Sequence, residues 1–66
     1  MRVTANGEPF EVEPDTTVSG FIRQRGLDPI HVVVERNGEA LERRRYDEVR
    51  LADGDRLELV RAVAGG

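Results

Sequence analysis

The first 26 residues, MRVTANGEPFEVEPDTTVSGFIRQRG, contain the two signals that decide the fold, a β-hairpin and a short amphipathic helix directly after it. Apolar and polar residues alternate along residues 1–5, as in a strand with one buried face. Asn6-Gly7 is the strongest short hairpin signal, because both central positions of a type I′ turn need a positive φ. Alternation resumes at residues 10–13. We therefore expect an antiparallel hairpin over residues 1–13.

Residues 18–25 have the spacing of a helix with one apolar face. The apolar positions i, i+3 and i+4 are Val18, Phe21 and Ile22. Thr16 or Thr17 can cap the N-terminus by accepting a hydrogen bond from an early backbone N–H. Gly26 suits the left-handed residue that ends a helix. We expect the apolar stripe to face the core.

A second hairpin follows the helix. Residues 30–35 contain three successive valines, which predicts a strand that is buried on both faces or central in the sheet. Asn37-Gly38 repeats the turn signal of the first hairpin and leads to a short strand around residues 39–41. His31 opens the valine strand without a second histidine, cysteine or serine near it in the pattern. We interpret it as structural or exposed.

The last strand is expected over residues 56–62, after the tight turn Asp53-Gly54-Asp55. In this turn Gly54 supplies a positive φ, and the aspartate side chains can bond nearby backbone amides. Its alternation separates two sets of side chains, with Leu57 and Leu59 facing inward and Glu58 and Val60 facing outward. An exposed apolar side chain near the chain's end can anchor a partner. Val60 and Glu58 are therefore candidate docking residues, although a single exposed valine needs no functional explanation.

This order of elements predicts an α+β protein with the β-grasp fold. A mixed sheet of four to five strands would carry one main α-helix across one face. The helix stripe would pack against Met1, Val3, Leu57 and Leu59. We expect residues 1–61 to form the β-grasp domain and residues 62–66 to form a flexible C-terminal tail that ends in Gly-Gly.

Composition argues against a stand-alone enzyme. The chain has 66 residues, no cysteine and one histidine, and it shows no phosphate-binding or metal-ligand motif. We therefore expect no catalytic residues in the enzyme sense and no metal.

A net charge of −3 argues against nucleic acid as a partner. No signal peptide is recognisable, and no apolar run approaches the roughly 20 residues that span a bilayer, so we expect a cytoplasmic protein without a membrane partner.

The final residues are small. The sequence ends in Ala62-Val63-Ala64-Gly65-Gly66. Glycine has no Cβ, so a Gly-Gly backbone can pass through a channel that is too narrow for side chains. Chain ends are also often simply disordered, and the dipeptide alone does not decide between these interpretations.

Several segments in their joint order resemble the ThiS family of bacterial sulfur carrier proteins, which is ubiquitin-like and related to MoaD. They are the Asn6-Gly7 hairpin, the helix entry at residues 14–18, the segments 32–38 and 51–59, and the small C-terminal residues 62–66. The resemblance covers essentially the whole chain. Each piece alone is common, whereas the order that ends in Gly-Gly is specific.

The resemblance implies a substrate-like carrier. The Gly66 carboxylate would be adenylated by an E1-like adenylyltransferase, ThiF, with ATP and magnesium bound by that partner and no cofactor bound by this chain. Sulfur from cysteine, held as a desulfurase persulfide, would then replace AMP and give a thiocarboxylate. Thiazole synthase, ThiG, would use the sulfur to build the thiazole of thiamine. The tail residues Ala62, Val63, Ala64 and Gly65 would enter the partner's active site.

Related proteins leave alternatives open. The chain also resembles carriers for molybdopterin, tRNA thiolation, cysteine or secondary-metabolite synthesis, and ubiquitin-like protein modifiers. From another class, it could be a non-catalytic β-grasp interaction module.

All ten basic residues are arginine; this reflects composition bias or protects an activated acyl group from attack by side-chain amines. Arg43-Arg44-Arg45 is a solvated face or a docking patch.

Overall fold

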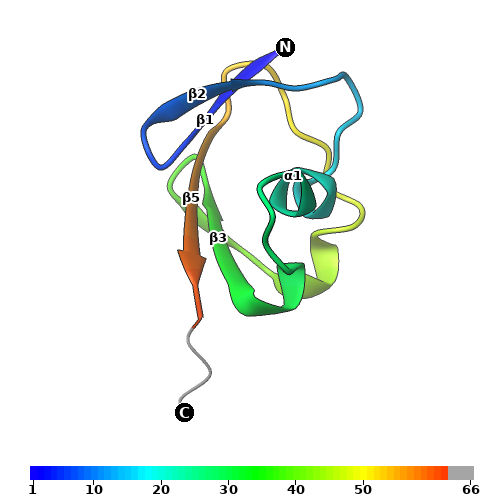
Figure 1. Ribbon diagram of the computed structural model, residues 1–66, viewed down its shortest axis with the longest axis vertical. Coiled ribbons are helices and arrows are strands. Elements are labelled where there is room, and N and C mark those ends of the chain that lie inside the picture. Colours follow the sequence, from blue (N-terminus) through cyan, green and yellow to red (C-terminus); the bar gives the residue numbers. More distant parts are fainter. Residues whose placement is uncertain (63–66) are drawn as a thin grey trace.

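A five-stranded mixed sheet curves around one α-helix in the computed structural model, whose described residues are 1–62 (Figure 1). The strands are β1 (Arg2–Ala5), β2 (Glu8–Glu11), β3 (Val32–Arg36), β4 (Glu39–Leu41) and β5 (Arg56–Arg61). The helix α1 spans Val18–Gln24, and two 3₁₀ turns span Pro29–His31 and Arg43–Arg45. The strand order is β2-β1-β5-β3-β4, with β5 parallel to β1 and antiparallel to β3. This is the β-grasp fold, as expected.

Both predicted hairpins are confirmed. β1 pairs with β2, and β3 pairs with β4, each in antiparallel register. Asn6 and Gly7 have φ values of 52° and 84°, and Asn37 and Gly38 have values of 53° and 86°. Positive φ at both central positions is what a type I′ turn requires. The Asn-Gly pairs therefore set the register of both hairpins.

The helix begins and ends where its sequence signals lie. Thr17 is the N-cap residue, and its Oγ1 accepts a hydrogen bond of 3.0 Å from the backbone N–H of Gly20. Gly26 has a φ of 78°, the left-handed conformation expected after a helix C-terminus. Gly20 lies close to this cap, since a Cβ there would come within 3.2 Å of Thr17 Oγ1. A glycine in the first turn thus leaves room for the cap.

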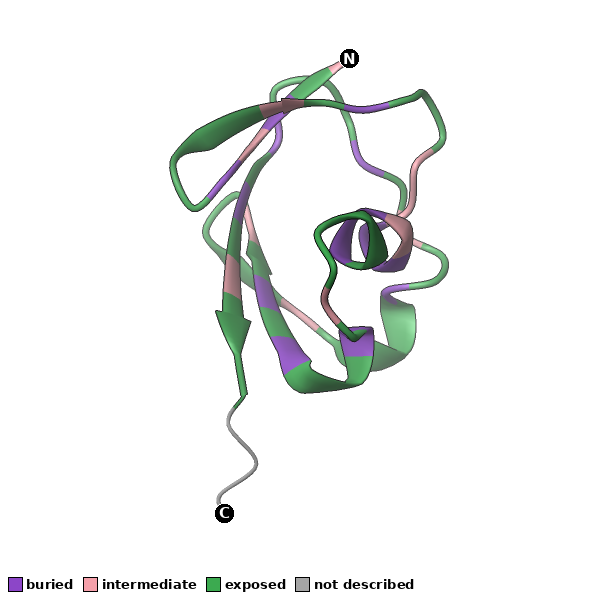
Figure 2. Ribbon diagram, in the orientation of Figure 1, coloured by how far each residue is buried: buried purple, intermediate pink, exposed green. Residues whose placement is uncertain are grey.

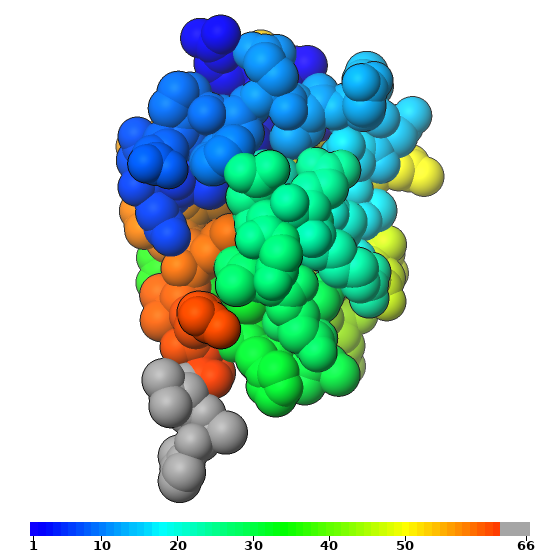
Figure 3. All heavy atoms as spheres, in the orientation of Figure 1, coloured from blue at the N-terminus to red at the C-terminus, as the bar shows by residue number. Residues whose placement is uncertain are grey.

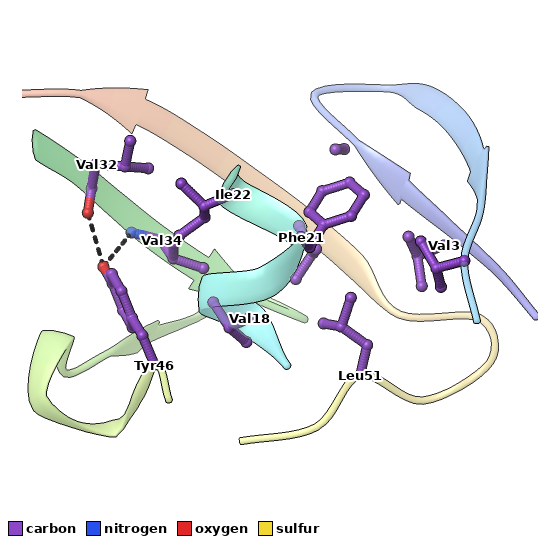
Figure 4. Close-up of a cluster of buried hydrophobic side chains, with 11 residues drawn as sticks. Val3, Val18, Phe21, Ile22, Val32, Val34, Tyr46 and Leu51 are labelled. Carbon is purple, nitrogen blue, oxygen red and sulfur yellow. Dashed lines mark hydrogen bonds between the residues drawn. The ribbon is translucent and has the colours of Figure 1, made fainter. Parts of the chain in front are cut away.

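The core lies between α1 and the inner face of the sheet, where the buried residues are concentrated (Figures 2 and 4). Its fully enclosed side chains include the predicted helix stripe and residues of β1, β3 and β5: Val3, Val18, Phe21, Ile22, Val32, Val34 and Leu57. Met1 and Leu59 are partly buried against them. Phe10 adds an edge-to-face contact with Phe21, with ring centroids 5.6 Å apart. The predicted core is confirmed.

Tyr46 is a core residue that the sequence pattern did not reveal. It follows the three arginines of the second 3₁₀ turn and is only 3% exposed. Its hydroxyl donates to Val32 O at 2.9 Å and accepts from Val34 N at 3.1 Å (Figure 4). These two bonds tie the charged segment to the backbone of β3.

Two expectations about the third strand are wrong. The strand begins at Val32, because Pro29–His31 form a 3₁₀ turn in which Asp28 Oδ1 accepts from Ile30 N at 3.0 Å. His31 therefore lies in that turn and does not open the strand. Val33 is 45% exposed, so β3 is buried on one face alone. The central strand is β5, because it is the one inserted between the two hairpins.

We predict that Tyr46→Phe lowers the free energy of unfolding by about 1–2 kcal/mol, because it leaves the buried N–H of Val34 without its acceptor. Urea titration followed by circular dichroism measures the change. Arg44→Ala, at an exposed position two residues away, is the matched control and should shift stability by less than about 0.5 kcal/mol. Equal midpoints for Tyr46→Phe and wild type would contradict this role of the hydroxyl.

Candidate functional site

The end of β5 is the point from which the small C-terminal residues extend. β5 pairs with β3 through the last residue of the strand, with Arg61 opposite Val32. One residue later, the backbone N–H of Ala62 donates to His31 O at 2.7 Å. Figure 3 shows this end of β5 at the surface, at the same end of the molecule as the Pro29–His31 turn. Ala62 is thus tied by its backbone to the body of the protein.

The turn residue Asn6 holds β5 from one side. Its backbone N–H donates to Leu57 O at 2.9 Å. Its side chain then bonds the next part of the strand twice, accepting from Leu59 N at 2.9 Å and donating to Leu59 O at 3.2 Å. The side-chain amide therefore extends the parallel β1–β5 pairing beyond the end of β1.

The second turn asparagine, Asn37, holds β5 at its start. Its Oδ1 accepts from Arg56 N at 2.8 Å, and its backbone N–H donates to Arg56 O at 2.8 Å. Its Nδ2 donates to Asp55 Oδ1 at 3.0 Å. Both Asn-Gly turns therefore fix the strand that carries the C-terminal residues.

Asp55 is a buried carboxylate that joins three segments at this point. Its side chain is 6% exposed, and its Oδ2 accepts from Arg36 Nε at 3.0 Å and from Ala52 N at 2.7 Å. Burial alone would raise the pKa of Asp55. The hydrogen bonds from Ala52, Asn37 and Arg36, together with the charge of Arg36, outweigh burial and hold the pKa below its ordinary value of 3.8.

The predicted docking residues lie on the outer face of the sheet. Val60 is 59% exposed and Glu58 is also exposed, as the alternation of β5 predicted. The register of the sheet places Val33 opposite Val60 and Glu35 opposite Glu58. We call these four residues the β3–β5 patch. Two of them belong to β3 and were not predicted, because single-strand alternation does not reveal which strands become neighbours.

Most of the predicted tail lies outside the residues that the structure describes. These are Val63, Ala64, Gly65 and Gly66. Ala62 is exposed and follows directly on β5. The proposed roles of these residues in a partner's active site therefore stay predictions.

The three adjacent arginines occupy a surface 3₁₀ turn, as one of the two interpretations expected. Arg44 pairs with Glu42 at 3.4 Å and Arg45 with Glu48 at 3.2 Å. Arg43 donates to Pro29 O at 3.3 Å. Each guanidinium thus has a partner within the chain, which favours a solvated face over a docking patch.

Other kinds of site were sought in the same part of the chain. Over residues 1–62, no group of three or more histidine, aspartate or glutamate side chains is arranged to hold a metal ion. No helix in that range has the length and apolar character needed to cross a membrane.

Asn6 and Asp55 both belong to predicted turns, but their sequence signals did not identify their distant partners. Asn-Gly predicts a turn, and nothing local shows that the asparagine side chain reaches a strand 53 residues away. Asp55 belongs to a predicted turn in which aspartates bond nearby amides, and that part of the prediction is confirmed at Ala52. Its ion pair with Arg36 depends on the sheet order.

Comparison with known proteins gives a consistent result. The model of the ThiS family matches residues 3–66. The chain is 39% identical over 62 residues to the sulfur carrier protein ThiS of Bacillus subtilis, covering 92% of this chain and 94% of that protein. A crystal structure of the thiamine biosynthesis protein ThiS from Geobacter metallireducens superposes with a TM-score of 0.79 at 33% identity, over 100% of both chains.

A longer relative also matches. The chain is 38% identical over all its 66 residues to a thiazole synthase of Magnetococcus marinus. It spans 20% of the length of that protein. The region similar to this chain is thus one part of a larger polypeptide there.

We predict that Asn6→Gly loosens β5 locally. Glycine keeps the positive φ of the turn without strain, while both side-chain bonds to Leu59 are lost. The free energy of unfolding should fall by about 1 kcal/mol. In amide hydrogen exchange, the Leu59 N–H should lose more protection than the Val34 N–H, which Tyr46 holds independently. Equal loss of protection at both amides would contradict a local role of the Asn6 side chain in holding Leu59.

We predict that Asp55 makes the free energy of unfolding depend on pH in the acidic range. Because its pKa is lowered in the folded state, the stabilisation is fully present above 3.8 and is lost as the pH falls through the folded-state pKa. Asp55→Asn should cost about 2 kcal/mol at neutral pH, since all the contacts of the carboxylate are with donors. The difference from wild type, measured by urea unfolding, should shrink at about pH 3. Asp47→Asn, at an exposed position, is the control; a difference that does not change with pH would contradict the assignment.

Proposed function

This chain belongs to the ThiS family, and on that premise we propose that it is a sulfur carrier, not an enzyme, whose Gly66 carboxylate becomes a thiocarboxylate. The observation that carries the proposal is the family match, which runs through Gly65 and Gly66 to the last residue. The anchoring of β5 and Ala62 supports it, because the residues that follow start from a fixed point at the end of the sheet.

The chemistry requires a partner enzyme. A carboxylate is a poor electrophile, so we propose that an E1-like adenylyltransferase of the ThiF type joins Gly66 to AMP and releases pyrophosphate from ATP. We propose that the outer sulfur of a desulfurase persulfide attacks the acyl group and displaces AMP, which gives an acyl disulfide. A thiol reductant then breaks the S–S bond and leaves the thiocarboxylate on Gly66. ATP and magnesium belong to the activating enzyme, and this chain contributes the acyl group and the slender Ala62–Gly66 segment. Because adenylation consumes ATP, we propose that the protein acts in the cytoplasm.

The proposed destination of the sulfur is the thiazole of thiamine. Two relatives support this choice, one named a thiazole synthase and the other a thiamine biosynthesis protein. A thiazole synthase of the ThiG type would then take the sulfur from the thiocarboxylate. Val60 and Glu58 on the outer face of β5 are proposed to contact the partners.

Intact-mass analysis of the chain tests the carrier role. The protein is produced together with its own activating enzyme and a sulfur donor. We expect a mass increase equal to the replacement of one oxygen by sulfur, located at Gly66 by fragmentation. An isopeptide adduct to other proteins would instead identify a modifier. An unchanged mass in the presence of the active partner and donor would refute the carrier role.

We predict that Gly66→Val reduces ATP–pyrophosphate exchange by the activating enzyme at least about 100-fold, because a displaced reacting group loses its aligned geometry. The fold should keep its thermal midpoint, since residue 66 lies beyond the last strand. Arg44→Ala, which leaves the C-terminal residues intact, should exchange at the wild-type rate. Undiminished exchange with Gly66→Val would contradict the assignment of Gly66 as the reacting residue.

A further inference from the structure

Two exposed arginines lie at the end of the molecule from which the C-terminal residues extend. Arg61 is the last residue of β5, and Arg25 directly follows α1. Both line one groove of about 280 Å³, in which the Arg25 guanidinium lies 4.3 Å from the centroid of the Phe10 ring. Six ion pairs form among residues 1–62, and neither arginine takes part in them. This end of β5 therefore carries positive charge that no ion pair within the described residues neutralises.

A cation near the end of β5 suits the proposed chemistry. Arg61 precedes Gly66 by five residues. The reacting end is an anion at each stage of the proposed reaction, first as a carboxylate, then as an acyl adenylate with its phosphate, and finally as a thiocarboxylate. Opposite charges a few Å apart attract each other, and more strongly away from bulk water. A positive side chain at position 61 is thus favourable, and either arginine or lysine would supply it.

Arginine and lysine differ in their reactivity toward an activated acyl group. A lysine ε-amine with its ordinary pKa of about 10.4 is deprotonated in about 1% of molecules at about pH 8.5. The deprotonated amine is a competent nucleophile. The guanidinium of arginine stays protonated in proteins, so it has no free electron pair for attack. Arginine therefore supplies the charge without the competing reaction.

The chain's primary amine lies far from the end of β5. None of the ten basic residues is lysine, which leaves the α-amino group of Met1. This group donates to Val12 O at 2.9 Å. In the parallel pairing of β1 with β5, Ala5 lies opposite Leu57. Met1 is four positions before Ala5 and Ala62 is five positions after Leu57, so about 30 Å of sheet separates them. Figure 1 shows the N-terminus and the end of β5 at opposite ends of the molecule.

The reach of the C-terminal residues excludes Met1 and includes position 61. Ala62 and Gly66 are four residues apart and span at most about 14 Å. A lysine at position 61 would be within reach, because its four-carbon stem adds about 6 Å. His31 is also near, since its carbonyl oxygen accepts from Ala62 N at 2.7 Å. An acyl-imidazole is itself an activated acyl group, however, and would pass the acyl group on to sulfur, whereas an amide is stable.

We propose that Arg61 is a selectivity residue for the activated acyl group, because it provides positive charge close to Gly66 without an amine that would capture the acyl group as a stable amide. The inference rests on the proposed function. In the reaction that arginine prevents, an amine attacks the carbonyl carbon of the acyl adenylate and forms a C–N bond. The C–O bond to the phosphate breaks, AMP leaves with the electron pair, and a proton of the amine passes to water.

The experiment adds the missing amine and keeps the charge. Wild type, Arg61→Lys and Arg61→Gln are each incubated with the activating enzyme of the same organism, ATP and magnesium, without a sulfur donor, and their intact masses are measured. We expect Arg61→Lys to lose the mass of one water, with the new bond located by fragmentation between positions 61 and 66. Wild type and Arg61→Gln should keep their masses. The rate of loop closure should rise about tenfold from about pH 7.5 to about pH 8.5, because the deprotonated fraction of the amine does.

The matched control is Arg2→Lys, which adds the same amine at an exposed position at the start of β1. Along the sheet, position 2 is about 26 Å from the level of Ala62, beyond the combined reach of the last four residues and a lysine side chain. Arg2→Lys should therefore keep its mass. With a sulfur donor present, it should form as much thiocarboxylate as wild type, whereas Arg61→Lys should form less than about half as much, because the tethered amine competes with sulfur.

ATP–pyrophosphate exchange distinguishes the possible failures. If Arg61→Lys exchanges like wild type and closes no loop, the inference is overturned and the carrier role stands. If Arg61→Lys loses exchange, Arg61 serves recognition by the enzyme and the selectivity role is wrong. Equal loop closure by Arg2→Lys would overturn the argument from reach. If wild type neither supports exchange nor forms the thiocarboxylate, the carrier role fails and the inference fails with it.

Discussion

The fold depends on the insertion of the last strand between the two hairpins. Neither hairpin pairs directly with the other, and β5 supplies the hydrogen bonds that join them, parallel to β1 and antiparallel to β3. The asparagine of each hairpin turn also bonds β5, so each turn serves its own hairpin and the central strand at once. Asp55 secures the start of β5 through Arg36 and Asn37.

Local features of the fold were predictable from the sequence. Both Asn-Gly turns, the Thr17 cap and the helix stripe depend on residues a few positions apart, where spacing and backbone preference decide the outcome. Tyr46 was missed because its partners, Val32 and Val34, lie 14 and 12 residues away. The valine run was misjudged because three β-branched residues fit a half-buried strand as well as a buried one.

The candidate site also has a part that local sequence predicted and a part that depends on distant residues. Val60 and Glu58 followed from the alternation of one strand, because side chains on a strand point to opposite faces in turn. Val33 and Glu35 join them through the register between β3 and β5, which no short window of sequence specifies. The assignment of Gly66 depends on the family match, which includes residues 65 and 66.

Because of the position of β5, the protein can fold only after nearly all of residues 1–61 have been synthesised. Residues 56–61 complete the sheet, and they are followed almost at once by the proposed reacting group. A ribosomal product that stops before residue 56 lacks the centre of its sheet, cannot bury its core and is exposed to proteases. A chain that is folded therefore contains at least the residues through β5. Loss of the segment just before the proposed reacting residue would thus be visible as loss of the fold.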